Sequence, residues 1–268
     1  MKNPNAHPNV LPLIDLTGLS VLITGGAGAI GRVMVRVLAD HGARVRAVDI
    51  KPVDEIRAVL DSAGVVDEGV DCSQVDCTSE TEVNAFFAEM AGTGQMPHVV
   101  CCHAGLVRPG PIETFGTKDF EDTLDLNLGS AFLVSRAAVA QWLAMDMNGH
   151  LIYTTSWVQD VPWPEITAYT ASKSALRTLM RGYAREMADR GIRANAVAPG
   201  IVGVGMAKRQ WDTDPSYRTR ARKAIPLGEM QTPESVAHAF LFLCSPMAAY
   251  MTGSVLLVDG GCSLYPMD

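Results

Sequence analysis

The sequence alternates short, apolar runs with longer segments whose apolar residues recur at helical spacing, and this alternation constrains the fold more than any other feature. The apolar runs predict strands over residues 20–24, 43–50, 69–76, 98–103, 151–155, 193–198 and 254–258. The amphipathic segments predict helices over residues 30–41, 80–90, 118–146, 168–190 and 233–243. Strands without a polar face that alternate with helices are typical of a parallel sheet covered on both sides. The pattern therefore predicts an α/β fold with a doubly wound parallel sheet.

Composition limits the domain count and the kinds of partner. The chain has 268 residues, 48% of them hydrophobic, which suits a single domain whose core needs no disulfide or metal. We expect residues 17–268 to form that domain and residues 1–16 to form an N-terminal arm. The net charge of −7 argues against a nucleic-acid partner.

The cysteines and the apolar segments bear on metals and on location. None of the six cysteines is spaced as CxxC, so we expect reduced thiols and no metal site. The sequence shows no secretory signal and no apolar run of about 20 residues that could cross a membrane. We therefore expect a cytoplasmic protein without a membrane partner.

A glycine-rich turn, residues 24–31, lies between the first predicted strand and the first predicted helix. Ligands of doubly wound sheets bind at the carboxyl ends of the strands, which is where this turn lies. The backbone N–H groups at a helix start favour a phosphate anion, and glycine lets the backbone approach it. Three glycines also occur in ordinary turns, so the turn needs support from its context.

Asp49 ends the second predicted strand and supplies that support. A carboxylate about 20 residues after such a turn can bind the ribose hydroxyls of a dinucleotide. The same carboxylate would repel the 2′-phosphate of NADP, so Asp49 predicts NAD. Lys51 is the nearby cation that could weaken this preference for NAD over NADP. The alternative interpretation of Asp49 is a solvated loop carboxylate.

Tyr169 and Lys173 are four residues apart on a predicted helix and therefore share one face. A nearby ammonium stabilises a phenolate and lowers the tyrosine pKa, which makes Tyr169 a candidate proton donor and acceptor. The spacing also occurs on ordinary helices, where the pair is simply solvated. Ser156 follows the fifth predicted strand and so lies at the same edge of the sheet, where its hydroxyl could hold a substrate oxygen beside Tyr169.

With these motifs in this order, the sequence resembles the short-chain dehydrogenase/reductase family from about residue 16 to residue 261. The matching motifs are TGxxxGxG at residues 24–31, Asp49, the segment Asp76, Cys77 and Thr78, then Asn127, Ser156, Tyr169 and Lys173, Pro199 with Gly200, and finally Asp259, Gly260 and Gly261. The resemblance implies a Rossmann-type fold and hydride transfer between a nicotinamide and a carbinol or carbonyl carbon.

The resemblance also implies roles for individual residues. Tyr169 would be the general acid and base, and Lys173 would bind the nicotinamide ribose and lower the Tyr169 pKa. Ser156 would orient the substrate oxygen, and Asn127 would hold a water that links Lys173 to solvent. The implied cofactor-binding residues are Thr24, Gly25, Gly28, Ala29, Ile30, Gly31, Asp49, Asp76, Cys77, His103, Ala104, Gly105, Tyr169, Lys173, Pro199, Gly200 and Val202.

Three departures from the family pattern bear on the site. Ala29 replaces the middle glycine of the first motif, so the backbone at this position must have a conformation that accommodates a methyl group. Cys102 and His103 stand where the family usually has two asparagines. His103 is then either a second acid or base, or a structural hydrogen-bonding substitute for asparagine. Val204 replaces a threonine, so backbone groups near Ile201 and Val202 would have to hold the nicotinamide carboxamide.

The substrate side is expected to involve residues 203–231, a long connection that we interpret as a lid. Met206 and Trp211 could form its apolar roof, or Trp211 could be a packing anchor. Six Lys and Arg side chains of this segment form either a solvated face or, for one of them, a site for an anionic substrate group. Trp157 and Gln159 beside the pocket favour a sugar or polyol.

The sequence therefore predicts an NAD-dependent dehydrogenase that interconverts a secondary alcohol and its ketone, most simply of a sugar or polyol. One alternative is a 3-oxoacyl or cyclic-ketone reductase. Another, from a different class, is a catalytically weak NAD-sensing binding protein, which the presence of all four catalytic residues disfavours. Relatives in the family are commonly tetramers, so we expect a homotetramer whose only other partner is the small-molecule alcohol or ketone.

Overall fold

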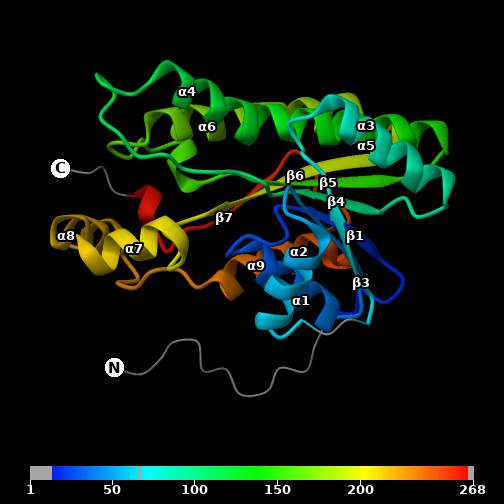
Figure 1. The fold of residues 1–268 in the computed structure, drawn as a ribbon, viewed down its shortest axis with the longest axis horizontal. Helices are drawn as coiled ribbons and strands as arrows, with labels where there is room; N and C mark the ends of the chain where they lie inside the picture. Colours follow the sequence, from blue (N-terminus) through cyan, green and yellow to red (C-terminus); the bar gives the residue numbers. More distant parts are fainter. Residues whose placement is uncertain (1–13, 66–67, 265–268) are drawn as a thin grey trace.

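The computed structural model describes residues 14–65 and 68–264, and its central element is a parallel sheet of seven strands (Figure 1). The spatial order of the strands is β3-β2-β1-β4-β5-β6-β7, so the order reverses between β1 and β4. The strands are β1 (Ser20–Thr24), β2 (Arg44–Asp49), β3 (Val70–Gln74), β4 (Val99–Cys102), β5 (Gly149–Thr154), β6 (Ile192–Pro199) and β7 (Val255–Val258). Each predicted strand is present, and the prediction of a single doubly wound Rossmann-type domain is confirmed.

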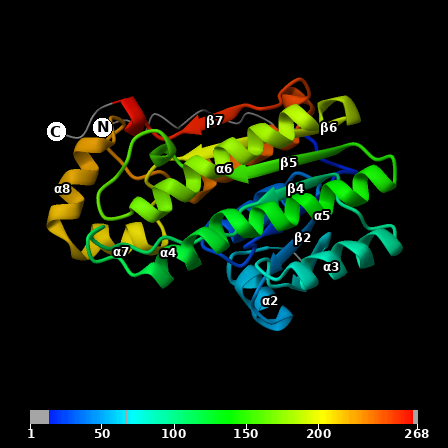
Figure 2. The ribbon, with the colours of Figure 1, turned by 90° about the horizontal axis from the view of Figure 1, so that it is seen from above.

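Helices cover both faces of the sheet, as Figures 1 and 2 show. One face carries α1 (Gly31–Asp40), α2 (Val53–Ser62) and α9 (Pro233–Cys244). The other carries α3 (Glu80–Gly92), α4 (Thr117–Leu124), α5 (Ser130–Ala144) and α6 (Thr167–Glu186). Successive side chains of a strand point to opposite faces, so Val21 and Ile23 enter the core under α1 while Leu22 enters the core under α5.

Two helical regions differ from the sequence prediction. Helix α2 was not predicted, because only Ile56 and Leu60 on it are buried and so short an apolar stripe gives little periodic signal. The helix predicted over 118–146 is divided into α4 and α5 by a π-helical turn, Asp125–Gly129. Such widened turns occur mostly at functional sites, and this one contains Asn127.

Residues 203–231 fold mainly into α7 (Gly205–Thr213) and α8 (Pro215–Ala224), which lie together at one end of the molecule (Figure 1). Most of the predicted arm, residues 1–13, lies outside the described residues. Its last part belongs to the domain, which corrects the boundary at residue 16. Leu16 is only 3% exposed in the core, and its N–H donates to the carbonyl of His41 at 2.8 Å.

In the part of the chain that the structure describes, no helix is both long and apolar enough to pass through a bilayer. The same residues contain no cluster of three or more metal-ligating side chains, and all six cysteines are free thiols. The strand order of the sheet reverses between β1 and β4. A crevice at that point, beyond the carboxyl ends of the strands, is the usual ligand site of such a sheet.

Candidate active site

Two adjoining pockets open at the carboxyl edge of the sheet. The larger, of about 900 Å³, runs along the ends of β1, β2 and β4. The smaller, of about 220 Å³, lies between the loop after β5, the loop after β6 and helices α7 and α8. The residues that line both pockets are Ile30, Val107, Tyr169, Val204 and Met206. Tyr169 therefore lies at the junction, where a reacting atom in one pocket could meet a group bound in the other.

The glycine-rich turn forms one wall of the larger pocket and has no room for additional side chains. Gly25 has a φ of +70°, and a Cβ on it would lie 3.0 Å from the Cα of Ala104. A Cβ on Gly31 would lie 2.1 Å from the carbonyl oxygen of Gly25. The result is a bare backbone surface at the start of α1, which fits the pyrophosphate of a dinucleotide. In this turn Gly25, Gly28, Ala29 and Ile30 line the pocket, and Thr24 and Gly31 are buried.

Two carboxylates mark the far end of the larger pocket. The Oδ2 atom of Asp49 accepts a hydrogen bond from the N–H of Ala27 at 3.1 Å, so the carboxylate is held beside the glycine-rich turn. Asp76 accepts from the N–H and the hydroxyl of Thr78 at 2.8 and 2.6 Å, and Cys77 lines the pocket between them. Asp49 thus lines the larger pocket beside the glycine-rich turn, and its contact with ribose hydroxyls stays a prediction.

Ser156 and Tyr169 face each other where the two pockets join. Ser156 follows β5 and caps the 3-10 turn Trp157–Gln159. Burial raises the pKa of Tyr169 above its usual value of 10, and the nearby Ser156 hydroxyl lowers the pKa by less. The phenol is therefore protonated at neutral pH and able to donate to a carbonyl oxygen.

Lys173 lies one turn further along α6, behind the tyrosine ring. Its Nζ donates to the carbonyl of Thr154 at 2.7 Å and lies 5.6 Å from the centre of the Tyr169 ring. Burial lowers the pKa of Lys173 to about 8, because the ammonium has lost most of its hydration. Burial therefore outweighs any lowering of the Tyr169 pKa by Lys173, and the role that the family resemblance implies for Lys173 stays a prediction.

Asn127 lies inside the π-helical turn and is fully buried. Its side-chain oxygen accepts from the N–H of Leu106 at 2.8 Å, and its amide nitrogen donates to the carbonyl of Leu106 and the hydroxyl of Ser172, both at 3.0 Å. A Cβ on Gly105 would meet the Asn127 oxygen at 3.0 Å and the Lys173 Nζ at 3.5 Å. The side chain thus fastens the loop after β4 to α6, and both amide hydrogens already have acceptors.

His103 is part of the scaffold at the end of β4. Its backbone N–H and that of Ala104 donate to the hydroxyl of Thr24 at 3.0 and 3.1 Å, and its Nδ1 pairs with the hydroxyl of Thr154 at 2.8 Å. Burial, with a smaller contribution from Lys173, lowers the pKa of His103 to about 4. A ring that stays neutral and pairs with a hydroxyl fits the structural alternative and not that of a second acid or base.

The methyl group of Ala29 fits the backbone of the turn, because Ala29 is not among the residues with positive φ.

At Val204, the backbone groups that were expected to replace the missing threonine hydroxyl are only partly available. The carbonyl of Ile201 accepts from the N–H of Gln231 at 2.9 Å, and the carbonyl of Val202 accepts from that of Val204 at 2.8 Å. Both carbonyls are therefore already engaged within the loop.

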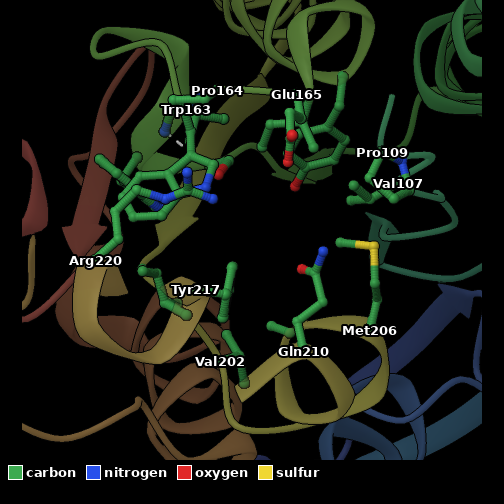
Figure 3. Close-up of a pocket in the computed structure, with 18 of the residues that line it drawn as sticks. Val107, Pro109, Trp163, Pro164, Glu165, Val202, Met206, Gln210, Tyr217 and Arg220 are labelled. Carbon is green, nitrogen blue, oxygen red and sulfur yellow. Dashed lines mark hydrogen bonds between the residues drawn. The ribbon is translucent and has the colours of Figure 1, made fainter. Parts of the chain in front are cut away.

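The smaller pocket contains part of the predicted substrate side. Trp157 and Met206 line it, together with Gly200 and Val202, which were expected at the cofactor. Pro199 is buried in β6 and lines neither pocket. Figure 3 shows Trp163 and Arg220 on one side of the open space and Glu165 and Val107 on the other.

Two predicted substrate residues lie elsewhere. Gln159 is only 7% exposed and does not line the smaller pocket, and its backbone carbonyl accepts from the hydroxyl of Ser174 on α6 at 2.7 Å. Trp211 lines a separate cavity, and the guanidinium of Arg222 stacks on its ring at 5.3 Å. Trp211 is therefore a packing anchor between α7 and α8, and its assignment to the roof was wrong.

Sequence reasoning missed Gln231, which holds the loop after β6 in place. Its side-chain oxygen accepts from the N–H of Gly200 at 2.9 Å, and its backbone carbonyl accepts from the N–H of Gly203 at 2.8 Å. The position of Gln231 just before the start of α9 gave no signal, because no motif marks it. Glu165 and Tyr217 were also missed as pocket residues, and no motif marks either of them. Arg220, one of the six cations considered for an anionic substrate group, lines the smaller pocket.

Comparison with known proteins agrees with this geometry. A family model described as enoyl-(acyl carrier protein) reductase matches residues 25–263. The chain is 32% identical to 3beta-hydroxysteroid dehydrogenase 1 of Eggerthella lenta over 94% of its length and 96% of that protein. It is 33% identical to glucose 1-dehydrogenase of Gluconobacter oxydans over 92% of its length and 93% of that protein.

Among solved structures, a putative 2-deoxy-D-gluconate 3-dehydrogenase from Agrobacterium tumefaciens, with bound NADP, superimposes with a TM-score of 0.83 at 25% identity. The match covers 94% of this chain and 98% of that one. Taken with the ordered motifs and the two joined pockets, these matches show that the chain belongs to the short-chain dehydrogenase/reductase family.

Proposed function

We propose that the protein is an NAD(H)-dependent oxidoreductase that interconverts a secondary alcohol and its ketone. The family and the dehydrogenase relatives make it an oxidoreductase of CH–OH groups. The observation that carries the finer proposal is the position of Tyr169 at the junction of the two pockets, with Ser156 lining the smaller pocket beside it.

In this proposal a bound nicotinamide supplies or accepts the hydride, and the protein handles the proton. In ketone reduction the Tyr169 phenol donates its proton to the substrate oxygen, which Ser156 holds by a hydrogen bond. In alcohol oxidation the phenolate takes the hydroxyl proton instead. The ammonium of Lys173 lies next to the phenol, so it stabilises the phenolate formed during reduction. Asn127 fastens the loop after β4 to Ser172, the residue before Lys173 on α6.

The preference for NAD is supported by Asp49. The Asp49 carboxylate lines the larger pocket, where Lys173 donates to the carbonyl of Thr154 and the other two cations, Arg108 and Lys118, both pair with Asp122. A 2′-phosphate next to Asp49 would meet a negative charge and find none of these cations free to neutralise it. The Agrobacterium structure contains NADP, so the preference within the family is set locally and has to be measured.

For the substrate we propose a sugar or polyol first. Aromatic rings with the polar side chains Gln210, Glu165 and Arg220 surround the smaller pocket, and the glucose and gluconate dehydrogenase names of relatives agree. A second candidate is a cyclic apolar alcohol. It is favoured by the largely aliphatic remainder of the lining, which includes Ile166 and Val202, and by the hydroxysteroid dehydrogenase relative. The homotetramer, the cytoplasmic location and the lid role of residues 203–231 stay predictions.

Replacing Tyr169 tests the proposal. Tyr169→Phe keeps the ring but removes the proton donor, and we expect turnover to fall by about 10²- to 10⁴-fold while NADH binding is retained. Turnover is measured at the nicotinamide absorbance on a panel of aldoses, polyols, hydroxy acids and cyclic alcohols. Tyr183→Phe is the matched control, because Tyr183 is also on α6 but lines neither pocket. Unchanged turnover in Tyr169→Phe would contradict the proposed role.

A further inference from the structure

Arg220 differs from the other basic side chains of residues 203–231 because it lines the smaller pocket and has no polar partner. Among the described residues it forms no hydrogen bond or ion pair, and its Nε is buried without an acceptor. Lys208, in contrast, is paired with Asp212 at 2.5 Å, and Arg218 donates to the carbonyls of Trp211 and Asp212 at 2.7 and 2.9 Å. Arg222 stacks on Trp211 outside the smaller pocket.

The guanidinium of Arg220 is held in place by aromatic rings. Its Cζ lies 5.2 Å from the centre of the Trp163 ring and 6.0 Å from that of Tyr217, and both of these side chains are buried. Stacking restrains a guanidinium without using its N–H groups, so the donors remain available in the plane of the fork. The cation is therefore preorganised and still lacks acceptors.

The acidic residue of the pocket does not neutralise this cation. Glu165 lines the opposite side of the open space (Figure 3), and no ion pair joins it to Arg220. Its place is fixed by its backbone, whose carbonyl accepts from the N–H of Gly110 at 2.8 Å. A ligand between the two sides would thus meet a cation on one side and a carboxylate on the other.

We propose that Arg220 binds a carboxylate carried by the substrate, so that the substrate class is a secondary alcohol bearing a carboxylate remote from its carbinol carbon. This rests on the proposed function, because the carbinol end is placed at Ser156 and Tyr169. A planar carboxylate matches the planar guanidinium, and its oxygens supply acceptors for a guanidinium that has none, including its buried Nε–H. Sugar acids and hydroxylated apolar ring acids both carry this group.

The test measures binding, so it does not depend on turnover. Two pairs of probes are titrated into the NADH complex by calorimetry: gluconate against gluconamide, and cyclohexanecarboxylate against cyclohexanecarboxamide. We expect the acid of at least one pair to bind about 10- to 100-fold more tightly than its amide, the range for a hydrogen bond to a charged group. The pair that shows the preference distinguishes a sugar acid from an apolar ring acid.

Variants separate recognition from structure. Arg220→Gln should weaken binding of the acid about 10- to 100-fold more than binding of the amide, and Arg220→Lys should fall between. Arg222→Gln is the matched control, since it removes a neighbouring cation of α8 and should keep the acid preference. Equal binding of acid and amide by the wild type, or an equal loss of both in Arg220→Gln, overturns the proposal. Loss of turnover in the Tyr169 experiment is a separate result and does not alter this one.

Discussion

The two pockets are built in different ways. The larger is shaped by backbone atoms, since Gly25 and Gly31 leave no space for a Cβ and the hydroxyl of Thr24 accepts from two backbone N–H groups at the end of β4. The smaller is shaped by side chains that stack on one another. Trp157 and Trp163 lie edge to face at 5.5 Å, and Trp163 and Tyr217 at 6.3 Å.

This difference explains which residues tolerate change. A backbone surface depends on the absence of a few Cβ atoms and on a few side-chain acceptors, such as the Thr24 hydroxyl, that hold backbone N–H groups. A side-chain surface depends on the identity of each ring, and it joins the loop after β5 to α8, far apart in the sequence. We therefore expect the larger pocket to be most sensitive at its glycines, and to tolerate substitution where a side chain neither accepts from the backbone nor contacts the cofactor.

Among the substitutions that test this comparison of the two pockets, Gly31→Ala is expected to have the largest effect. The added Cβ would lie 2.1 Å from the Gly25 carbonyl oxygen, so the turn must move. We expect NADH binding to weaken by at least about 100-fold, corresponding to about 2.7 kcal/mol, and the free energy of unfolding to fall by about 1–3 kcal/mol. NADH fluorescence titration and thermal unfolding measure the two effects.

Gly182→Ala is the matched control for this change. Gly182 lies within α6, and a Cβ there would have no atom within 4 Å. We expect it to retain NADH binding and to be more stable by about 0.4–1 kcal/mol, because alanine costs less backbone entropy. If Gly31→Ala bound NADH as tightly as Gly182→Ala, the backbone description of the larger pocket would be wrong.

A smaller effect is expected for Asp49→Ser, which tests the carboxylate on the backbone-shaped side. The change removes an acceptor for the ribose hydroxyls and the charge that opposes a 2′-phosphate. We expect the ratio of kcat/KM for NAD to that for NADP to fall by about 10- to 100-fold, the range for a hydrogen bond to a charged group. Wild-type preference for NADP, or an unchanged ratio in the variant, would show that Asp49 does not set the choice.

The matched control for Asp49 is Asp61→Ser. Asp61 is an exposed carboxylate near the end of α2 that lines neither pocket, so its replacement removes the same charge at a distance. We expect the cofactor ratio to stay unchanged. If Asp61→Ser changed the cofactor ratio as much as Asp49→Ser, the preference for NAD would depend on overall charge and not on a contact between Asp49 and the cofactor.

The fold could be predicted because the strands of a doubly wound sheet are buried on both faces, which leaves continuous apolar runs in the sequence. β1 was predicted to the residue. The π-helical turn could not be predicted, because the apolar spacing continues through residues 118–146 without a proline or a glycine pair to mark the break. Widening the helix depends on tertiary hydrogen bonds of Asn127, which the local sequence does not encode.

The same distinction separates the predicted site residues from those that the sequence did not single out. Asp49 and the glycines belong to short local motifs whose geometry follows from the chain itself. Arg220 and Gln231 act through contacts with segments remote in sequence, and Trp211 could be assigned only once α8 was placed beside it. Burial likewise reversed the expected direction of the Tyr169 pKa, since desolvation depends on everything packed around the ring.

The smallest effect is expected for His103→Asn, which tests whether a side chain at the backbone-shaped pocket can change without loss. The contacts of residue 103 to Thr24 use the backbone N–H, and asparagine can still hydrogen-bond to the Thr154 hydroxyl. We expect kcat/KM to change by less than about tenfold, a difference of 1.36 kcal/mol, with no change in the shape of its pH profile. If the fall in kcat/KM on one side of the pH profile disappeared in the variant, His103 would be an acid or base in the reaction.

The pH dependence of stability should change in a defined direction in the same variant. Burial lowers the pKa of His103 from 6.5 to about 4, so between these values the unfolded chain binds a proton that the folded chain does not. His103 therefore costs stability progressively as the pH falls from about 6.5 to about 4. His150, whose pKa burial lowers to about 3, stays in both proteins and contributes equally to each. Urea unfolding at pH 7 and pH 4.5 should show a smaller loss of stability for His103→Asn than for the wild type, and equal losses would mean that His103 titrates normally in the folded protein.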